Sequence, residues 1–210
     1  MSEAAQRDAL GQRFSVSRET LTRLDRFAGL LRKWSPVINL VSSRTLPDLW
    51  ARHFLDSAQL MDIAPLASRS WADLGAGGGF PGLVVAILAA ELRPDLHVTL
   101  IESDQRKSAF LSQAARELGL DTKIIRRRAE EAEPLGADVV SARALAPLTR
   151  LLDLAERHLA PGGQALFLKG RQHDAEIEQA LDRWRFSVQK IRSITDPDAV
   201  VLKIKGVVRA

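Results

Sequence analysis

The first part of the chain places its apolar side chains with the period of an α-helix. They recur at spacings of three or four residues, at Leu21, Leu24, Phe27, Leu31 and Trp34. Such spacing puts them on one face of a helix. Ser17 is a suitable N-cap for this helix, and Pro36 is expected to end it. With a second helix expected from near Pro47, residues 1–67 are predicted to form an N-terminal helical extension.

From Trp71 onward, short apolar segments alternate with longer amphipathic ones. Strands are predicted at residues 71–74, 97–102, 122–127, 137–142 and 164–170. Helices are predicted from residue 82 and at residues 105–119, 148–163 and 174–184. Strands that alternate with helices indicate βαβ units, and hence a mainly parallel sheet with helices on both faces. Residues 68–210 are therefore predicted to form a second domain.

The end of the chain adds two strands, predicted at residues 186–194 and 199–206. Only four residues, Thr195–Asp198, separate them, whereas a parallel crossover needs about a dozen or more. The last two strands must therefore pair antiparallel. The predicted fold is α/β: a doubly wound, mainly parallel sheet of seven strands with an antiparallel last strand, after the helical extension. It resembles the class I S-adenosylmethionine (AdoMet) methyltransferases, whereas a nicotinamide-binding Rossmann domain would continue with parallel strands.

Composition narrows the chemistry. The 210 residues include no cysteine, which excludes disulfides, thiolate zinc sites and a cysteine nucleophile, and no metal is expected. The longest apolar run, Leu83–Ala90, is far shorter than the roughly 20 residues that cross a bilayer. The start of the chain lacks the apolar segment of a signal peptide, so we expect a soluble, cytoplasmic protein. The net charge of +4 is compatible with a nucleic-acid partner but is weak evidence alone.

The glycine-rich stretch after the first strand can be read in two registers. Gly77, Gly79 and Gly82 match the pattern G-x-G-x-x-G, and Glu102 lies 20 residues beyond Gly82, as in a nicotinamide-dinucleotide site. The same stretch also matches D-x-G-x-G-x-G, with Asp73, Gly75, Gly77 and Gly79.

The second register fits the end of the strand better. Pro81 favours a helix that begins there, which leaves Gly75–Gly79 in the loop and little room for a pyrophosphate. The loop would then lie against the methionine part of AdoMet, and Asp73 would reach its ammonium group directly or through water. A tight turn that needs glycine only for its backbone angles remains the alternative.

The ends of the next two strands carry candidate ligands. Glu102 ends the second strand at the carboxyl edge of the sheet, where open α/β sheets bind ligands. Its carboxylate could accept both ribose hydroxyls, or it could be a solvated charge. Ala129 and Glu130 follow the third strand, where an adenine edge would lie. Arg126–Arg128 are expected to be a solvated strand end rather than a dedicated RNA patch.

Five motifs together resemble one family over nearly the whole chain. They are NLVS at Asn39–Ser42, RHFLDSAQL at Arg52–Leu60, DLGAGGGFPGL at Asp73–Leu83, SARALAPL at Ser141–Leu148 and LKG at Leu168–Gly170. The chain resembles the RsmG (GidB) family, bacterial AdoMet-dependent methyltransferases that modify N7 of one guanine in 16S ribosomal RNA. The resemblance implies AdoMet as cofactor, 16S rRNA or the small ribosomal subunit as partner, and cofactor contacts at Gly75, Phe80, Ala129, Glu130 and Arg143, with Glu102 as the ribose partner.

The chemistry of guanine N7 agrees with what the sequence lacks. N7 has an in-plane lone pair and no proton, so no general base is obligatory, and the enzyme must mainly position N7 and exclude water. A cysteine pair and an Asp/Asn-Pro-Pro-aromatic motif are both absent. Arg143 is instead expected over the methyl-transfer site, in contact with the AdoMet carboxylate, an RNA phosphate or guanine O6. A surface arginine that caps a helix is the alternative.

The helical extension supplies further candidates. His53, Asp56 and Ser57 fall at i, i+3 and i+4 on one predicted helix face, and His53 also shares an apolar stripe with Trp50, Phe54 and Met61. The resemblance favours a role for these residues in the wall of an active site. The alternatives are that His53 is a core residue and that Asp56 is structural. We take Arg143, His53 and Asp56 as the candidate catalytic residues.

Contacts with RNA are predicted at Asn39, Arg52, Ser57, Lys169 and Arg171, although a solvated strand end explains Lys169 and Arg171 equally well. Tyrosine is absent, so recognition should rest on shape and phosphate charge, with the target base turned out into the pocket. Open alternatives are a methyltransferase for another RNA, a protein or a small molecule, a non-catalytic cofactor-binding protein and a nicotinamide oxidoreductase. The oligomeric state is open, with a monomer favoured.

Overall fold

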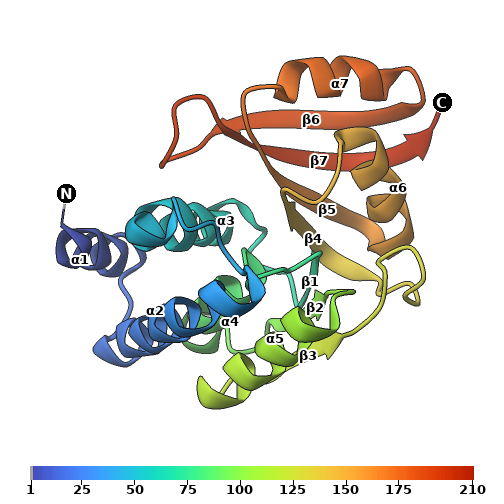
Figure 1. Cartoon of the computed structure of the whole chain (residues 1–210). Coiled ribbons are helices and arrows are strands. Elements are labelled where there is room, and N and C mark those ends of the chain that lie inside the picture. Colours follow the sequence, from blue (N-terminus) through green and yellow to red (C-terminus); the bar gives the residue numbers. More distant parts are fainter. Residues whose placement is uncertain (1) are drawn as a thin grey trace.

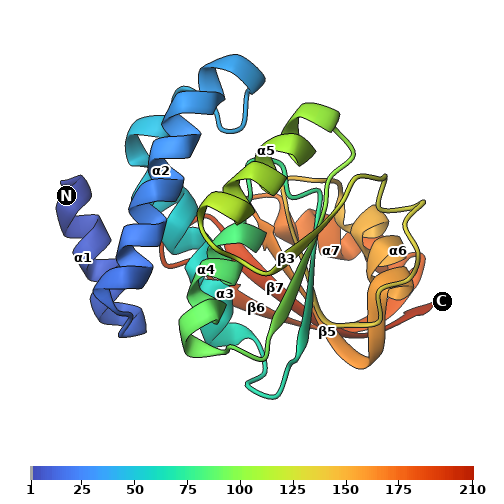
Figure 2. The same cartoon turned by 90° about the horizontal axis from the view of Figure 1, so that it is seen from below.

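The structure is a computed structural model that describes residues 2–210. Its first part is helical and lies against one side of the molecule (Figures 1 and 2). The elements are α1 (Glu3–Phe14), α2 (Arg18–Ile38), the 3₁₀ turn η1 (Leu46–Asp48), the π-helical turn η2 (Trp50–Leu55) and α3 (Asp56–Ile63). Ser17 caps α2 as predicted, because its hydroxyl accepts a hydrogen bond from the Thr20 amide.

The described strands form one seven-stranded sheet in the order β3-β2-β1-β4-β5-β7-β6. They are β1 (Ser70–Leu74), β2 (His97–Ile101), β3 (Thr122–Ile125), β4 (Ala137–Arg143), β5 (Leu159–Lys169), β6 (Trp184–Arg192) and β7 (Val200–Arg209). The first five strands pair parallel, while β7 pairs antiparallel with both β5 and β6. This confirms the predicted fold, including the terminal hairpin.

Helices cover both faces of the sheet and enclose two apolar clusters. On one face lie α4 (Gly82–Leu92) and α5 (Gln105–Glu117), and on the other α6 (Leu148–His158) and α7 (His173–Leu181). Trp71 belongs to the cluster under α4, and its neighbour Ala72 to the cluster under α6, because successive side chains of a strand point to opposite faces.

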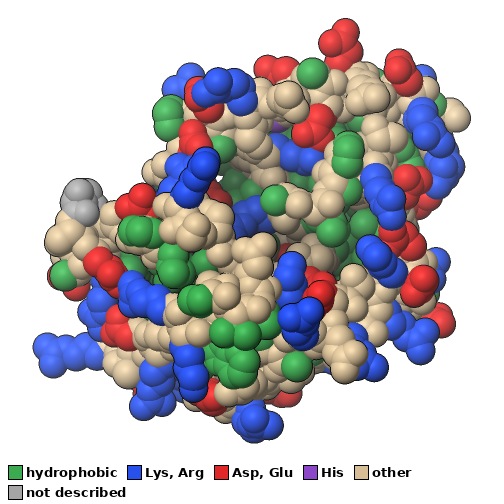
Figure 3. All heavy atoms as spheres, in the orientation of Figure 1, with side chains coloured by type: hydrophobic (Ala, Val, Ile, Leu, Met, Phe, Trp, Pro, Cys, Tyr) green, Lys and Arg blue, Asp and Glu red, His purple; other side chains and the backbone are tan. Residues whose placement is uncertain are grey.

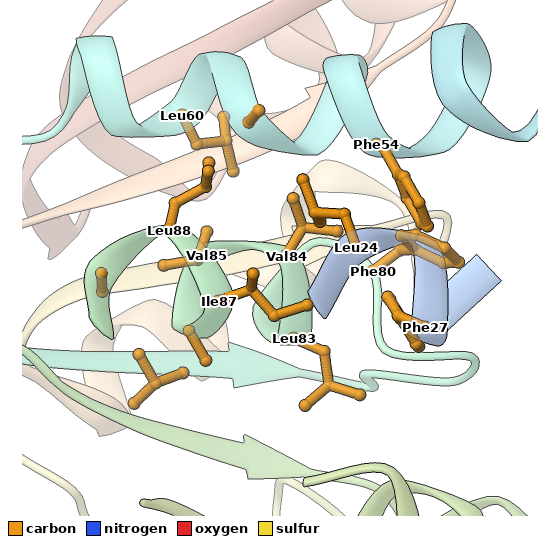
Figure 4. Packing of buried hydrophobic residues seen from close by; sticks show 14 of the residues in the cluster. Leu24, Phe27, Phe54, Leu60, Phe80, Leu83, Val84, Val85, Ile87 and Leu88 are labelled. Atoms are coloured by element: carbon orange, nitrogen blue, oxygen red, sulfur yellow. The ribbon is translucent and has the colours of Figure 1, made fainter. Parts of the chain in front are cut away.

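Helix α4 is apolar on every side, which its position explains. It lies between the sheet and the N-terminal helices α2 and α3 (Figure 4), so no face of it meets much water. Leu83, Val84, Ile87 and Leu88 are each fully buried, and each such burial stabilises the fold by about 1.5 to 3 kcal/mol. The N-terminal helices thus share one core with the sheet domain. The division at residue 67 falls in the turn before β1 and stays a prediction.

Three predicted helix ends were wrong. Helix α2 continues through Pro36 to Ile38. Its cap, Asn39, has φ 51° and donates its amide hydrogen to Ser35 O. The hydrogen bond that Pro36 cannot make costs little so near the helix end, because this left-handed cap closes the last turn. Helix α6 ends at His158, because the next residues pair with β4. Trp184 starts β6 rather than ending α7.

Within residues 2–210, no helix has both the length and the apolar character needed to cross a membrane. The same residues hold no group of three or more histidine and carboxylate side chains arranged to bind a metal ion.

Candidate functional site

The glycine loop after β1 needs glycine for two reasons. Gly75, Gly77 and Gly79 have φ values of 65°, 54° and 95°, a region that other residues seldom adopt. A side chain at Gly82 would collide with Leu100 and with Asp73, so glycine there lets α4 approach the sheet. Space next to Gly77 is open apart from the Gly75 carbonyl. The loop therefore exposes its backbone to the space above it.

Asp73 braces this loop from below. Its side chain is fully buried; Oδ1 accepts a hydrogen bond from Ser141 Oγ over 2.6 Å, and Oδ2 accepts one from the Gly82 amide over 2.9 Å. Burial raises the pKa of Asp73 to about 7, because desolvation disfavours the charged form. Both oxygens face the protein interior, so the predicted contact between Asp73 and the ammonium group of AdoMet is not part of this geometry.

Glu102 lies just beyond the end of β2 and holds the loop from the other side. Its Oε2 accepts the Gly77 amide hydrogen and its Oε1 the Asp104 amide hydrogen, each over 2.8 Å. Glu102 is 8% exposed and lines a cavity. Each carboxylate oxygen has further lone-pair capacity, so Glu102 is oriented by the backbone and can still accept hydroxyl groups of a ligand.

This space, which we call the loop cavity, has a volume of about 630 Å³. Its walls come from the glycine loop and from the ends of β2, β3 and β4. They include the predicted cofactor residues Gly75, Gly77, Phe80, Glu102, Ala129, Glu130 and Arg143. Sequence reasoning did not single out several other wall residues, among them Lys107 and Arg150, and Leu145 within the SARALAPL motif. Arg150 forms an ion pair with Glu130. The pKa of Glu130 is lowered first by a hydrogen bond to its own backbone amide and then by Arg150.

A second space, the strand-end cavity, lies where β4 and β5 end and β7 begins, and also has a volume of about 630 Å³. Asp56, Arg143, Lys169, Glu176 and Ser193 are among its wall residues. Figure 3 shows the surface hollowed at its centre, with lysine or arginine side chains inside the hollow. The two cavities share the residues from Arg143 to Pro147, and we call Ala144–Pro147 the partition.

The partition is fixed from behind. Lys169 Nζ donates hydrogen bonds to Ala146 O over 2.8 Å and to Glu176 Oε2 over 2.6 Å. The same Glu176 oxygen accepts the Leu148 amide hydrogen over 2.6 Å. Ala144 has φ 51°, a strained value for a residue other than glycine. Lys169 is therefore held by two acceptors inside the protein, and its contact with RNA phosphate stays a prediction.

Arg143 ends β4 where the two cavities meet. Its guanidinium lies over the Phe80 ring, 4.8 Å from the centroid. Nη2 donates to His53 Nδ1 over 2.7 Å and Nη1 to Arg52 O over 3.3 Å, while Asp56 Oδ2 lies 3.7 Å from Nη1. Burial lowers the pKa of Arg143. The structure thus brings the three candidate catalytic residues into one group.

The partners of His53 determine its protonation. An arginine side chain can only donate, so Nδ1 of His53 must be the acceptor. The proton is then on Nε2, which donates to Thr45 Oγ1 over 2.9 Å. Burial, with the nearby charges of Arg143 and Arg52, lowers the pKa of His53 to about 3. His53 is therefore neutral at physiological pH and serves to hold Arg143.

Asp56 is held by a segment remote in sequence. Its Oδ1 accepts hydrogen bonds from Gln59 Nε2 over 2.8 Å, Ser193 Oγ over 3.2 Å and Thr195 Oγ1 over 3.1 Å. Burial is the main cause that raises the pKa of Asp56. Ser193 and Thr195 belong to the β6–β7 loop, and no local pattern in the sequence could connect them to Asp56.

The remaining predicted RNA contacts differ in their exposure, and Arg52 joins the Arg143 group through its backbone carbonyl. Asn39 and Arg52 are exposed, at the end of α2 and in η2. Arg171 is exposed and forms an ion pair with Asp198 over 2.6 Å. Ser57, in the first turn of α3, is 0% exposed. A direct contact between Ser57 and RNA does not fit this position.

Comparison with known proteins adds the family context. The family model described as "GidB: rRNA small subunit methyltransferase G" matches residues 20–200. The relative named "Ribosomal RNA small subunit methyltransferase G" from Ruegeria pomeroyi is 55% identical over 195 residues, which cover 93% of this chain and 95% of that protein. The one from Paracoccus denitrificans is 52% identical, with 91% and 97% covered.

Solved structures are similar in fold. A SAM-dependent methyltransferase from Aquifex aeolicus matches with a TM-score of 0.59 at 12% identity, over 75% of this chain and 93% of that one. Ribosomal protein L11 methylase from Lactobacillus delbrueckii matches with a TM-score of 0.56 at 20% identity, over 71% and 76%. At such low identity these structures establish the fold alone.

Proposed function

Because the chain belongs to the rRNA small subunit methyltransferase G (GidB) family, we propose that it transfers the methyl group of AdoMet to N7 of one guanine in 16S rRNA. The observation that carries this proposal is the meeting of two cavities at Arg143. One cavity suits the cofactor and the other is open to a base. We further propose that the protein works in the cytoplasm on rRNA or the small subunit.

The loop cavity has the features that AdoMet requires. Its volume of about 630 Å³ lies within the range of small-molecule sites. The open backbone at Gly77 can lie against the methionine part, oriented Glu102 can accept the ribose hydroxyls, and Ala129 and Glu130 can border the adenine. AdoMet bound there supplies a methyl group on a positively charged sulfur.

The proposed reaction does not require a side chain to act as a general acid or base. As the N7–carbon bond forms, the carbon–sulfur bond breaks and its electron pair stays on sulfur. No proton has to leave N7. This agrees with His53, whose pKa of about 3 and hydrogen bonds at both ring nitrogens leave it unavailable as a base. What the chain contributes is positioning, worth about 7 to 11 kcal/mol in favourable cases.

Each residue of the Arg143 group then has a positioning role. His53 and Phe80 fix the guanidinium, which borders both cavities. The partition residue Leu145 also lines both cavities and can exclude water from the path between them. The helical extension, residues 1–67, supplies His53 and Asp56, and we propose that it faces the RNA.

The proposal can be tested by methyl transfer from labelled AdoMet to small subunits that lack the modification, and to protein-free 16S RNA. Borohydride and aniline then cleave RNA at 7-methylguanine. One strong cleavage site is the expected result, and the better substrate identifies the form that the protein reads. Label without cleavage would mean that another atom is methylated. An Arg143→Ala variant should lose most methyl transfer. The matched control is Arg69→Ala, an exposed arginine just before β1 that pairs with Asp95.

A further inference from the structure

The strand-end cavity has a carboxylate that is oriented but incompletely used. Oδ1 of Asp56 accepts three hydrogen bonds from Gln59, Ser193 and Thr195. Among the described residues no donor hydrogen bonds to Oδ2, whose ion pair with Arg143 spans 3.7 Å. The side chain is 15% exposed, and Asp56 lines this cavity. An oriented carboxylate oxygen is therefore free to accept hydrogen bonds from a ligand.

Arg143 beside it has donors to spare. A guanidinium carries five N–H groups, and within the described residues two acceptors, His53 Nδ1 and Arg52 O, hydrogen bond with it. Arg143 borders both cavities, whereas Asp56 borders only the strand-end cavity. Going from the loop cavity into the strand-end cavity, a ligand therefore meets first the proposed AdoMet site, then the hydrogen-bond donors of Arg143, and then the acceptor oxygen of Asp56.

The edge of guanine has the complementary order. N7 is followed by O6, a second acceptor, and then by the N1–H and N2 amine donors of the Watson–Crick edge. With N7 turned toward the loop cavity, O6 faces Arg143 and the two donors face Asp56. Adenine presents an amine in place of O6 and an acceptor at N1, which mismatches both side chains. Enzymes that act on a flipped base read this edge.

We propose that Asp56 is the residue that selects guanine, by accepting hydrogen bonds from the Watson–Crick edge while Arg143 donates to O6. This inference rests on the proposed function and assigns the strand-end cavity to the target base. Losing a hydrogen bond to a charged group costs about 1.5 to 3 kcal/mol, or about 10-fold to 150-fold in rate. Inosine lacks only the N2 amine, so it tests this contact with little other change.

The experiment compares small subunits reconstituted with ligated rRNA that carries guanosine or inosine at the target position. For the wild-type protein, kcat/KM should fall by about 10-fold or more with inosine. In Asp56→Ala and Asp56→Asn, kcat/KM with guanosine should fall, and the guanosine-to-inosine ratio should shrink to within about threefold. Wild type and each variant act on the same two bases. The difference in intrinsic N7 reactivity between guanosine and inosine therefore cancels when their guanosine-to-inosine ratios are compared.

AdoMet affinity, measured by calorimetry, should stay within about threefold in both variants, because Asp56 does not line the loop cavity. The matched control is Asp62→Asn on the same helix, an exposed carboxylate paired with Arg13, which should keep the wild-type ratio. A wild-type protein that methylates inosine as well as guanosine would overturn the inference, even if both variants are inactive. So would an Asp56→Ala variant that keeps the wild-type ratio. Failure of the proposed function is distinct, since wild type would then methylate no guanosine substrate at N7.

Discussion

Arg143 Nη2 donates a hydrogen bond to His53 Nδ1 over 2.7 Å, and this contact fixes the imidazole as the neutral tautomer with its proton on Nε2. A protonated His53 would place a second positive charge against the guanidinium. The pairing therefore links the position of Arg143 to the protonation of His53, and the structure favours the neutral form by burial and by charge.

The pH dependence of stability should reveal this neutral histidine. In the unfolded chain His53 takes up a proton below its ordinary pKa of 6.5, whereas in the folded protein it does so only near pH 3. The unfolded state thus binds more protons in this window, so His53 lowers stability as pH falls from 6.5. The contribution is at most about 1.4 kcal/mol per pH unit.

His53→Asn keeps an acceptor near the Nδ1 position but cannot titrate. Urea unfolding of both proteins from about pH 7 to pH 4 should show wild type losing stability relative to the variant on acidification. A constant difference across that range would mean that His53 is not held neutral. Thr22→Val, at an exposed helix position, serves as a control whose difference from wild type should not change with pH.

Asp73 should produce the opposite trend. Its pKa is raised to about 7 by burial, so the folded protein holds a proton that the unfolded chain releases near pH 4. The stability that this group contributes is therefore lost as pH rises toward 7. Asp73→Asn can still accept from the Gly82 amide through its oxygen, and it can turn its amide group toward Ser141.

We expect the free energy of unfolding of Asp73→Asn, relative to wild type, to increase between about pH 4 and pH 7. The change should be on the order of 1 kcal/mol per pH unit. Denaturant unfolding at several pH values measures it, and a relative stability that falls over this range would contradict the raised pKa.

Much of the fold follows from local patterns. The four residues between the last two strands were enough to predict an antiparallel hairpin, because so short a connection cannot cross over to form a parallel pair. The sequence also predicted that the candidate cofactor contacts Glu102, Ala129 and Arg143 lie close together, because the carboxyl ends of parallel strands meet at one edge of the sheet. By contrast, the end of α2 beyond Pro36 depends on a left-handed cap at Asn39, which the apolar period does not encode.

The details of the site depend on contacts between distant segments. Asp56 is oriented by Ser193 and Thr195, more than 130 residues away, and this contact leaves no periodic signal. Asp73 did have such a signal. Asp73 follows Trp71 by two residues, so both side chains lie on the same face of β1. Because Trp71 packs under α4, this spacing already indicated that Asp73 lies beneath the helix and away from the cavity.

Glu102 should be needed for cofactor binding. Replacing it with alanine removes the proposed ribose acceptor and also the acceptor of the Gly77 amide. AdoMet affinity should fall by about 1.5 to 3 kcal/mol, or roughly 10-fold to 150-fold. Calorimetric titration measures this, with exposed Glu117→Ala on α5 as the control. An unchanged affinity in Glu102→Ala would remove Glu102 from the cofactor site.

The last prediction separates the two uses of glycine in this chain. A Cβ at Gly82 would collide with Leu100 and Asp73, so Gly82→Ala must push α4 away from the sheet and should destabilise the protein by about 1 to 3 kcal/mol, as overpacking does. A methyl group added at Gly29, inside α2, would meet nothing within 4 Å, and replacing this glycine with alanine should stabilise the helix by about 0.5 to 1 kcal/mol. Thermal unfolding of the two variants should therefore shift the midpoint in opposite directions. A Gly82→Ala protein as stable as wild type would show that α4 does not need this close approach.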